Sequence, residues 1–200
     1  GKRSCNESTN CSMKYNQLGK TGYEISAISF GASSLGGVFH EIDEHKAIEA
    51  VHVALELGIN YFDVAPAYGG TKAETVLGRA LNGIPRGSYY LSTKVGKNTS
   101  SDGYGVDSFD YSGDGIRKSL DESAKRIGVD HFDIVHLHDI EYNNRVNTEW
   151  ALNEGMKTLF ALKQEGRIGA VGIGMYPVDL WERVLQEGLI DVGLYIISAA

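Results

Sequence analysis

The sequence is short of cysteine, of long apolar runs and of positive charge, and each shortage excludes a class of protein. Its only cysteines, Cys5 and Cys11, both lie in the first dozen residues. No disulfide can therefore join distant parts of the folded chain, and a reduced, cytoplasmic compartment is expected. No apolar run approaches the roughly 20 residues that span a bilayer. The formal net charge of -7 argues against nucleic acid or an anionic membrane as a partner, because both attract basic surfaces.

What is present is the composition of an ordinary globular domain. Hydrophobic residues make up 42% of the 200 residues and charged residues 22%, which allows one domain with a sizeable core. The first twelve residues contain no apolar stretch, and we interpret residues 1–12 as a disordered tail or a remnant of cloning, with Met13 as a natural start. Residues 13–200 are expected to form the folded domain.

Short apolar segments alternate along the chain with amphipathic segments of helical period. The apolar segments are nearly continuous in character, which is typical of strands buried on both faces. The predicted strands are Ile25–Gly31, Asn60–Val64, Tyr89–Val95, Phe132–His138, Ala170–Gly174 and Val192–Ile197. The predicted helices are Glu44–Leu57, Lys72–Leu81, Asp114–Ile127, Trp150–Gln164 and Val178–Gln186. This alternation predicts a parallel sheet with helical crossovers.

Two architectures fit such a sheet: an open doubly wound sheet and a closed barrel. A dinucleotide-binding doubly wound sheet carries Gly-x-Gly-x-x-Gly directly after its first strand, and residues 31–37, GASSLGG, do not match. Residues 15–22 instead predict a hairpin that closes the bottom of a barrel, because Gly19 and Gly22 suit a tight turn. We therefore predict an α/β fold of the (β/α)₈ (TIM) barrel class. About six of the eight units are present, so the domain is expected to be incomplete at its C-terminus.

In a barrel of this class, reactive groups lie where the strands end. Asp63, Tyr68, Lys94 and His138 occupy such positions. The free pKa of a phenol is about 10, a nearby ammonium such as Lys94 lowers it, and Asp63 is the obvious counter-ion for Lys94. An imidazole can orient a carbonyl oxygen while Tyr68 exchanges a proton with it. That is general acid–base chemistry, and it requires no metal.

Each of these residues also has an ordinary structural explanation. A single Asp or Lys at a strand end usually caps or faces solvent, and Tyr68 can be a packed loop aromatic. His136 and His138 share one face of a strand, so one of them can be structural. The two histidines can also bind a metal, although Asp139 is the only oxygen ligand close by. The joint pattern, rather than any single residue, favours catalysis.

At these positions the sequence resembles the aldo-keto reductase family, from Met13 to about Val192. The resemblance is carried by MKYNQLGKTGYEISAISFG, by GINYFDVAPAYGG with TKAETVLGRAL, by YYLSTKVG, by RIGVDHFDIVHLHD and by LKQEGRIGAVGIG. Three shorter motifs, HDIE at 138–141, FDYS at 109–112 and MYP at 175–177, are similar to one branch of the family. That branch contains L-galactose dehydrogenase and D-arabinose dehydrogenase.

The resemblance implies an NAD(P)-dependent oxidoreductase that acts on an aldose or another small carbonyl compound or alcohol. It implies Tyr68 as general acid and base, Lys94 and Asp63 as the pair that tunes it, and His138 as the residue that orients the carbonyl. The positions that it places at the cofactor are Gly31, Ala32, Ser33, Asp63, Gly174 and Met175. NAD and NADP both stay open at this point, as does the oligomeric state.

Three departures from the family pattern keep two alternatives open. Gly174 and Met175 stand where many members have Ser-Asn, and Leu194 stands where many have Gln. The closing LYIISAA does not resemble the family, whose cofactor-holding units are expected beyond Ala200. The chain is therefore expected to be a catalytic fragment, an inactive truncated isoform, or a regulatory or binding subunit of the same fold.

Overall fold

The computed structural model describes residues 12–37, 42–98 and 108–195. Cys5, Cys11 and nearly all of the expected N-terminal tail lie outside these residues, as does the end of the predicted strand that reaches Ile197. None of the helices in the described ranges is long and apolar enough to cross a membrane.

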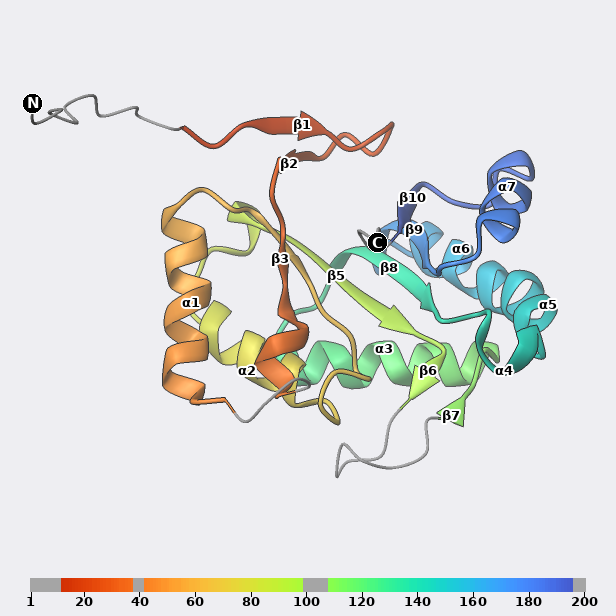
Figure 1. Ribbon diagram of the computed structural model, residues 1–200, viewed down its shortest axis with the longest axis horizontal. Coiled ribbons are helices and arrows are strands. Elements are labelled where there is room, and N and C mark those ends of the chain that lie inside the picture. The colour runs from red at the N-terminus through yellow and green to blue at the C-terminus, as the bar shows by residue number, and fades with distance from the viewer. Residues whose placement is uncertain (1–11, 38–41, 99–107, 196–200) are drawn as a thin grey trace, which may run out of the picture.

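Six parallel strands form the central sheet, and each strand lies next to the one that precedes it in that sheet (Figure 1). In sequence they are β3 (Phe30–Gly31), β4 (Tyr61–Asp63), β5 (Tyr90–Val95), β8 (Phe132–His138), β9 (Ile168–Gly174) and β10 (Val192–Leu194). The sheet curls into part of a barrel wall, so the predicted fold class is confirmed for the part of the chain that the structure describes.

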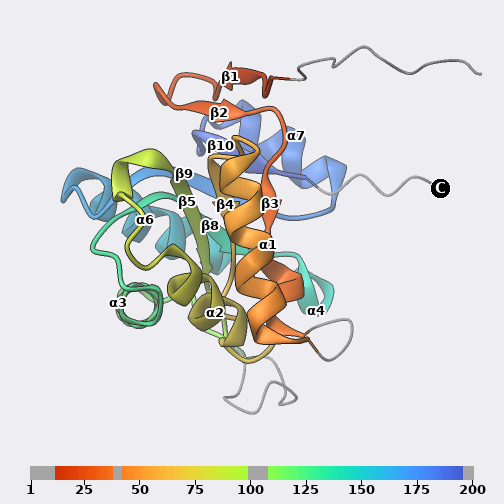
Figure 2. The same cartoon turned by 90° about the vertical axis from the view of Figure 1, so that its left-hand side faces the viewer.

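The helices lie on the outer face of this sheet (Figures 1 and 2). They are α1 (Glu44–Glu56), α2 (Lys72–Leu81), α3 (Gly113–Ile127), α6 (Met156–Gln164) and α7 (Val178–Gln186). Local signals set their ends. The Asp43 side chain accepts the backbone N–H groups of His45 and Lys46 at the start of α1, and Gly128 ends α3 in the left-handed conformation.

The predicted helix Trp150–Gln164 is longer and less regular than expected. It starts with α5 (Thr148–Trp150), passes through a π-helical turn, η3 (Ala151–Gly155), and continues as α6. Smaller elements complete the fold: η1 (Ala32–Gly36), η2 (Arg86–Ser88), α4 (Tyr142–Arg145) and the antiparallel pair β6 (Lys97–Asn98) and β7 (Ser108–Phe109).

The predicted first strand, Ile25–Gly31, is wrong as a single element. Its beginning belongs to β2 (Glu24–Ser26), which pairs antiparallel with β1 (Tyr15–Gln17), and its end is β3. Ser26 causes the break, because its N–H donates to Asn60 Oδ1 at 2.7 Å and its hydroxyl donates to the Ile28 carbonyl at 2.7 Å. The predicted hairpin is present, but its second strand lies beyond Gly22.

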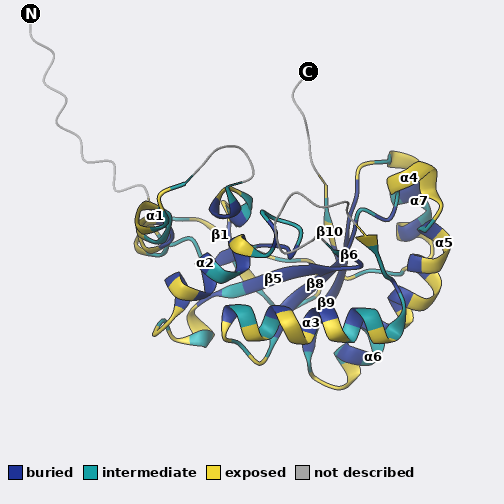
Figure 3. Ribbon diagram, turned by 90° about the horizontal axis from the view of Figure 1, so that it is seen from below, coloured by how far each residue is buried: buried dark blue, intermediate teal, exposed yellow. Residues whose placement is uncertain are grey.

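The two faces of the sheet build two separate cores. Side chains that alternate outward, such as Phe62, Leu91 and Val135, pack under the helices in the larger core. Figure 3 shows the buried strands in the centre and the helices exposed on their outer sides. Inward side chains such as Ile134 form a smaller cluster, against which Tyr23 of the hairpin segment packs. The hairpin therefore covers the end of the sheet where the strands begin (Figure 1).

Candidate active site

Three neighbouring strands bring the predicted polar residues to one end of the sheet. Asp63 ends β4, His138 ends β8, and Lys94 is the last residue but one of β5. Tyr68 lies in the loop that follows β4. All three strands run parallel, so their carboxyl ends lie together, at the end of the sheet away from the hairpin (Figure 1).

Lys94 and Asp63 form a buried ion pair beneath this end of the sheet. The Lys94 Nζ donates to Asp63 Oδ2 at 2.6 Å and to the Val64 carbonyl at 3.0 Å. Only 2% of the Lys94 side chain is exposed. Burial alone would lower the pKa of Lys94, but the negative charge of the Asp63 carboxylate acts against it and the net shift is upward. Lys94 is therefore an ammonium at neutral pH.

Two inward-facing residues of the sheet hold Asp63 from below. The Ser92 hydroxyl donates to Asp63 Oδ1 at 2.6 Å and accepts the Tyr61 hydroxyl at 3.0 Å. Both Ser92 and Tyr61 are buried. Each carboxylate oxygen of Asp63 thus accepts a hydrogen bond, which fixes the orientation of the carboxylate toward Lys94.

Tyr68 lies above Lys94, whose Nζ is 4.9 Å from the centre of the phenol ring. Burial raises the pKa of the Tyr68 phenol, and the Lys94 ammonium lowers it. The effect of Lys94 has the expected direction, but burial outweighs it and the net pKa is above the ordinary value. Tyr68 therefore carries its proton at neutral pH and can donate it.

His138 faces Tyr68, with the two rings 5.9 Å apart and nearly perpendicular. Burial, followed by the charges of Lys94 and Lys97, lowers the pKa of His138 well below its usual value, so the ring is neutral. Its Nδ1 is buried without a hydrogen-bond partner among the described residues. The buried Tyr111 hydroxyl donates to the His138 carbonyl at 2.6 Å and supports the strand end from behind. Tyr111 belongs to the FDYS motif.

His136 lies one step deeper on the same face of β8. It is fully buried, and burial lowers its pKa to about 4. A Cβ atom on Gly172 would come within 2.2 Å of His136 Nδ1, so the neighbouring strand needs glycine there. Among the described residues, no group of three or more His, Cys, Asp or Glu side chains is arranged to hold a metal ion.

Of the predicted catalytic residues, Tyr68, Lys94 and His138 border one cavity of about 390 Å³. It is lined by Ser33, Ala67, Tyr68, Lys94, Lys97, His138, Asp139, Tyr142, Gly174, Met175, Tyr176 and Leu194. Three of the positions assigned to the cofactor, Ser33, Gly174 and Met175, are therefore at the cavity, and Asp63 lies directly behind Lys94. The other two do not line it: Gly31 is exposed and Ala32 is fully buried against the helices.

Sequence reasoning missed several residues of this cavity. Lys97, Asp139, Tyr142 and Tyr176 all line it, and none is in the predicted set. Asp139 directly follows His138 and on a regular strand would point to the opposite face. Gly96 directly precedes Lys97, and a glycine at the end of a strand is the signal that could have indicated a change in the direction of the next side chain.

In a comparison with protein families, the model of the aldo/keto reductase family matches residues 27–197. The chain belongs to the aldo-keto reductase family. Among curated proteins it is 41% identical over 180 residues to L-galactose dehydrogenase from Arabidopsis thaliana, a match that covers 88% of this chain and 53% of that protein. It is 33% identical over 160 residues to D-arabinose 1-dehydrogenase from Saccharomyces cerevisiae, covering 78% of this chain and 44% of that protein.

Solved structures agree with the fold. An aldo-keto reductase from Pseudomonas aeruginosa superposes with a TM-score of 0.74 at 34% identity, over 86% of this chain and 64% of that one. The two curated relatives confirm the branch of the family that the HDIE, FDYS and MYP motifs indicate. The chain spans about half the length of these curated relatives.

Proposed function

We propose that the protein transfers a hydride between a nicotinamide dinucleotide, NAD or NADP, and the anomeric carbon of an aldose or another small carbonyl compound, with Tyr68 as the general acid and base. The observation that carries the proposal is the convergence of Tyr68, Lys94 and His138 on one cavity. The similarity to two sugar dehydrogenases supports the choice of an aldose.

We infer that the cofactor positions at the cavity would take the nicotinamide ring. Ser33, Gly174, Met175 and Leu194 all line the cavity, and Gly174 lies next to Leu194 and Lys94. Together the four residues offer mainly apolar surface and one hydroxyl. These residues would hold the cofactor, which supplies or accepts the hydride when bound.

The side chains of the chain itself move and hold the proton. In reduction, Tyr68 donates its phenolic proton to the substrate oxygen and becomes a phenolate; in oxidation, the phenolate form of Tyr68 accepts the proton of the anomeric hydroxyl. The Lys94 ammonium, fixed by Asp63 at 2.6 Å, stabilises the phenolate that forms when the proton leaves. Neutral His138 has an N–H that it can donate to the same oxygen, which holds that oxygen against Tyr68.

The test is Tyr68→Phe, assayed in both directions with an aldohexose and with each dinucleotide. The substitution removes one hydroxyl and keeps the ring, so packing against His138 is retained. We expect turnover to fall by about 10²–10⁴-fold, which is the usual contribution of a general acid. Dinucleotide binding, followed by nucleotide fluorescence, should persist.

The two outcomes that contradict the proposal point in different directions. Undiminished turnover of Tyr68→Phe would remove Tyr68 from the mechanism while leaving the enzyme. Wild-type protein that turns over no carbonyl compound or sugar would instead favour the inactive isoform or the regulatory subunit, in which the four residues are retained without catalysis.

A further inference from the structure

A second ion pair lies in the same cavity, and the proton transfer proposed above does not use it. Lys97 Nζ donates to Asp139 Oδ2 at 2.8 Å, and both residues line the cavity next to His138. Lys97 is only 9% exposed, and its ammonium also lies 4.4 Å from the centre of the Tyr142 ring.

Two left-handed residues bring this pair into the cavity. Side chains alternate between the faces of a strand, so Lys97, three residues after Lys94, would face away from it, as would Asp139 beside His138. Gly96 has φ +93 and Asp139 has φ +51, and each interrupts the alternation at the end of its strand. Non-glycine residues rarely adopt such a conformation, and those that do are concentrated at functional sites.

Position 96 requires glycine because of its surroundings as well as because of its φ. A Cβ atom there would lie 2.2 Å from the ring of Tyr111, the residue whose hydroxyl supports the His138 carbonyl. The same local packing therefore places His138 for the chemistry and turns Lys97 into the cavity. The second pair is built into the site together with the first.

The charges in the cavity indicate what kind of molecule it accepts. Among the lining residues that the structure describes there are two ammonium groups, and each has a carboxylate partner, Lys94 with Asp63 and Lys97 with Asp139. Recognition of a phosphate or carboxylate usually relies on cationic groups in excess. Paired donors and acceptors, close to aromatic rings such as Tyr142, suit a neutral molecule with several hydroxyl groups.

The position of Asp139 defines which part of that molecule it meets. Its Oδ1 lies 3.7 Å from His138 Nε2, too far for a hydrogen bond. Asp139 Oδ1 is therefore close to the place where His138 would hold the substrate oxygen. Because His138 does not donate to it, Asp139 Oδ1 can accept a hydrogen bond from the substrate. A hydroxyl on a carbon next to the reacting one can donate to it.

On the basis of the proposed function, we propose that Lys97 and Asp139 bind the hydroxyl groups of an uncharged aldose and set the preference for a polyhydroxylated substrate over a simple lactol. Asp139 accepts from the hydroxyls and Lys97 donates to them. Hydrogen bonds to charged groups are among the stronger ones in proteins, so the pair can set specificity without taking part in proton transfer.

The experiment compares substrates that differ only in what the pair would touch. The probes are an aldohexose, the matching hexuronic acid, and tetrahydropyran-2-ol, a lactol with the same reacting carbon and no other hydroxyl. The variants are Asp139→Asn, which keeps a residue that tolerates positive φ, and Lys97→Met. The matched control is Asp179→Asn, which removes the carboxylate of the exposed Arg145–Asp179 ion pair, outside the cavity.

We expect both variants to lower the ratio of kcat/KM for the aldohexose to kcat/KM for tetrahydropyran-2-ol about tenfold or more. Asp179→Asn should change neither value, and the wild type should prefer the aldohexose to the hexuronic acid. Equal losses on both neutral substrates, or no loss on either, would overturn the proposal. Circular dichroism checks that each variant is folded, and if Asp139→Asn is not, Lys97→Met and its conservative partner Lys97→Arg carry the test.

Binding measured without turnover separates this proposal from the proposed function. Saturation-transfer NMR reports binding of the aldohexose and of tetrahydropyran-2-ol to wild type and variants. If the wild type turns over neither compound, the proposed function fails; the pair is still supported when the aldohexose binds and both variants weaken its binding. An aldohexose that does not bind, or binds the variants equally well, contradicts the role of Lys97 and Asp139.

Discussion

At Lys94, a buried positive charge is tolerated only because Asp63 lies 2.6 Å away. Removing one partner of a buried ion pair leaves the other charge without compensation, which typically costs about 3–5 kcal/mol. We therefore expect Asp63→Asn to lower the free energy of unfolding by about that amount, measured by urea denaturation followed by circular dichroism.

A double-mutant cycle tests whether the cost comes from the unpaired charge. Lys94→Met removes the charge that Asp63→Asn leaves behind, so the double variant should be more stable than Asp63→Asn alone. Strictly additive losses would mean that Asp63 and Lys94 stabilise the fold independently.

His136 gives the stability of the protein a pH dependence with a definite sign. Its pKa is about 4 in the folded chain and about 6.5 when the chain is unfolded. Between these values the unfolded state binds a proton that the folded state does not. The free energy of unfolding therefore keeps its full value, as far as His136 is concerned, above about pH 6.5, and it falls as the pH is lowered toward 4.

We expect the wild type to lose up to about 3 kcal/mol more than His136→Leu between pH 7 and pH 4, because each pKa unit corresponds to about 1.4 kcal/mol. Urea denaturation of both proteins across this range measures the difference. Between pH 7 and pH 8.5 the two curves should run parallel, since His136 is neutral in both states there. Parallel curves down to pH 4 would show that His136 takes up protons without unfolding.

At the scale of elements, the loop that carries Tyr68 packs backbone against backbone on η1. A Cβ atom on Gly69, whose φ is +62, would lie 2.0 Å from the Gly36 carbonyl oxygen. We expect Gly69→Ala to push this loop away and to reduce turnover about tenfold or more, because small displacements of catalytic groups are costly. Steady-state kinetics with the aldohexose measures the loss.

Gly83→Ala is the matched control for this substitution. Gly83 also has a left-handed backbone, with φ +82, but nothing lies within 4 Å of its Cβ position. It should cost about 1–2 kcal/mol of stability through backbone strain alone and leave turnover unchanged. A similar loss of turnover in both variants would attribute the effect to strain rather than to the contact with η1.

How far the elements could be predicted depends on whether their signals were local. Helix α2 and helix α7 and strand β8 have the predicted bounds, because their periodicity and end residues lie within the segment itself. The break at Ser26 could not be predicted, since it depends on Asn60, 34 residues away in sequence. The π-helical turn η3 also escaped, because hydrophobic periodicity does not distinguish it from an α-helix over so short a stretch.

The residues of the site also differ in whether local signals in the sequence could place them. Asp63, Lys94 and His138 could be placed together because the ends of parallel strands meet at one edge of a sheet. Lys97 and Asp139 were missed, because strand alternation predicts the opposite face for both, and their actual direction depends on positive φ values at Gly96 and Asp139. The net pKa of Tyr68 was also out of reach, since it depends on how deeply the ring is buried.

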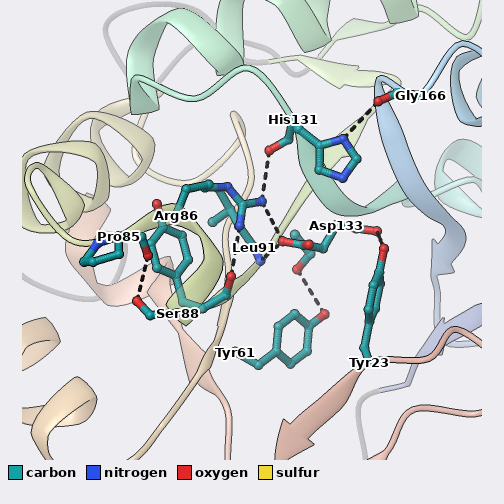
Figure 4. A network of polar contacts seen from close by, with 11 residues as sticks. Tyr23, Tyr61, Pro85, Arg86, Ser88, Leu91, His131, Asp133 and Gly166 are labelled. Carbon is teal, nitrogen blue, oxygen red and sulfur yellow. Dashed lines mark hydrogen bonds and ion pairs between the residues drawn. The ribbon is translucent and has the colours of Figure 1, made fainter.

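On the scale of the whole molecule, one end of the sheet carries the cavity and the other end carries a network of structural hydrogen bonds. The end opposite Tyr68 is held by Arg86, which donates to Asp133 Oδ2 at 2.6 Å and to the carbonyls of Tyr89 and His131 (Figure 4). Asp133 also accepts the Leu91 N–H at 2.8 Å. These bonds tie η2 and β5 to β8 and leave the cavity untouched.

The separation of the two ends predicts that stability and turnover can be changed independently. Asp133 and His138 are five residues apart on β8, about 16 Å at 3.3 Å per residue. Arg86→Met removes the charged partner of Asp133, so we expect the free energy of unfolding to fall by about 2 kcal/mol. Turnover at a temperature where the variant is folded should stay within about twofold of the wild type. Tyr68→Phe should instead lower turnover and leave the free energy of unfolding nearly unchanged.

The double variant Arg86→Met/Tyr68→Phe tests this separation directly. Sites this far apart that share no partner usually have additive effects, within about 0.5 kcal/mol. The double variant should therefore unfold like Arg86→Met in urea and turn over substrate like Tyr68→Phe. A turnover below that of Tyr68→Phe would show that the network around Arg86 also positions the cavity. The mechanical link would then be β8, the strand that carries Asp133 at one end and His138 at the other.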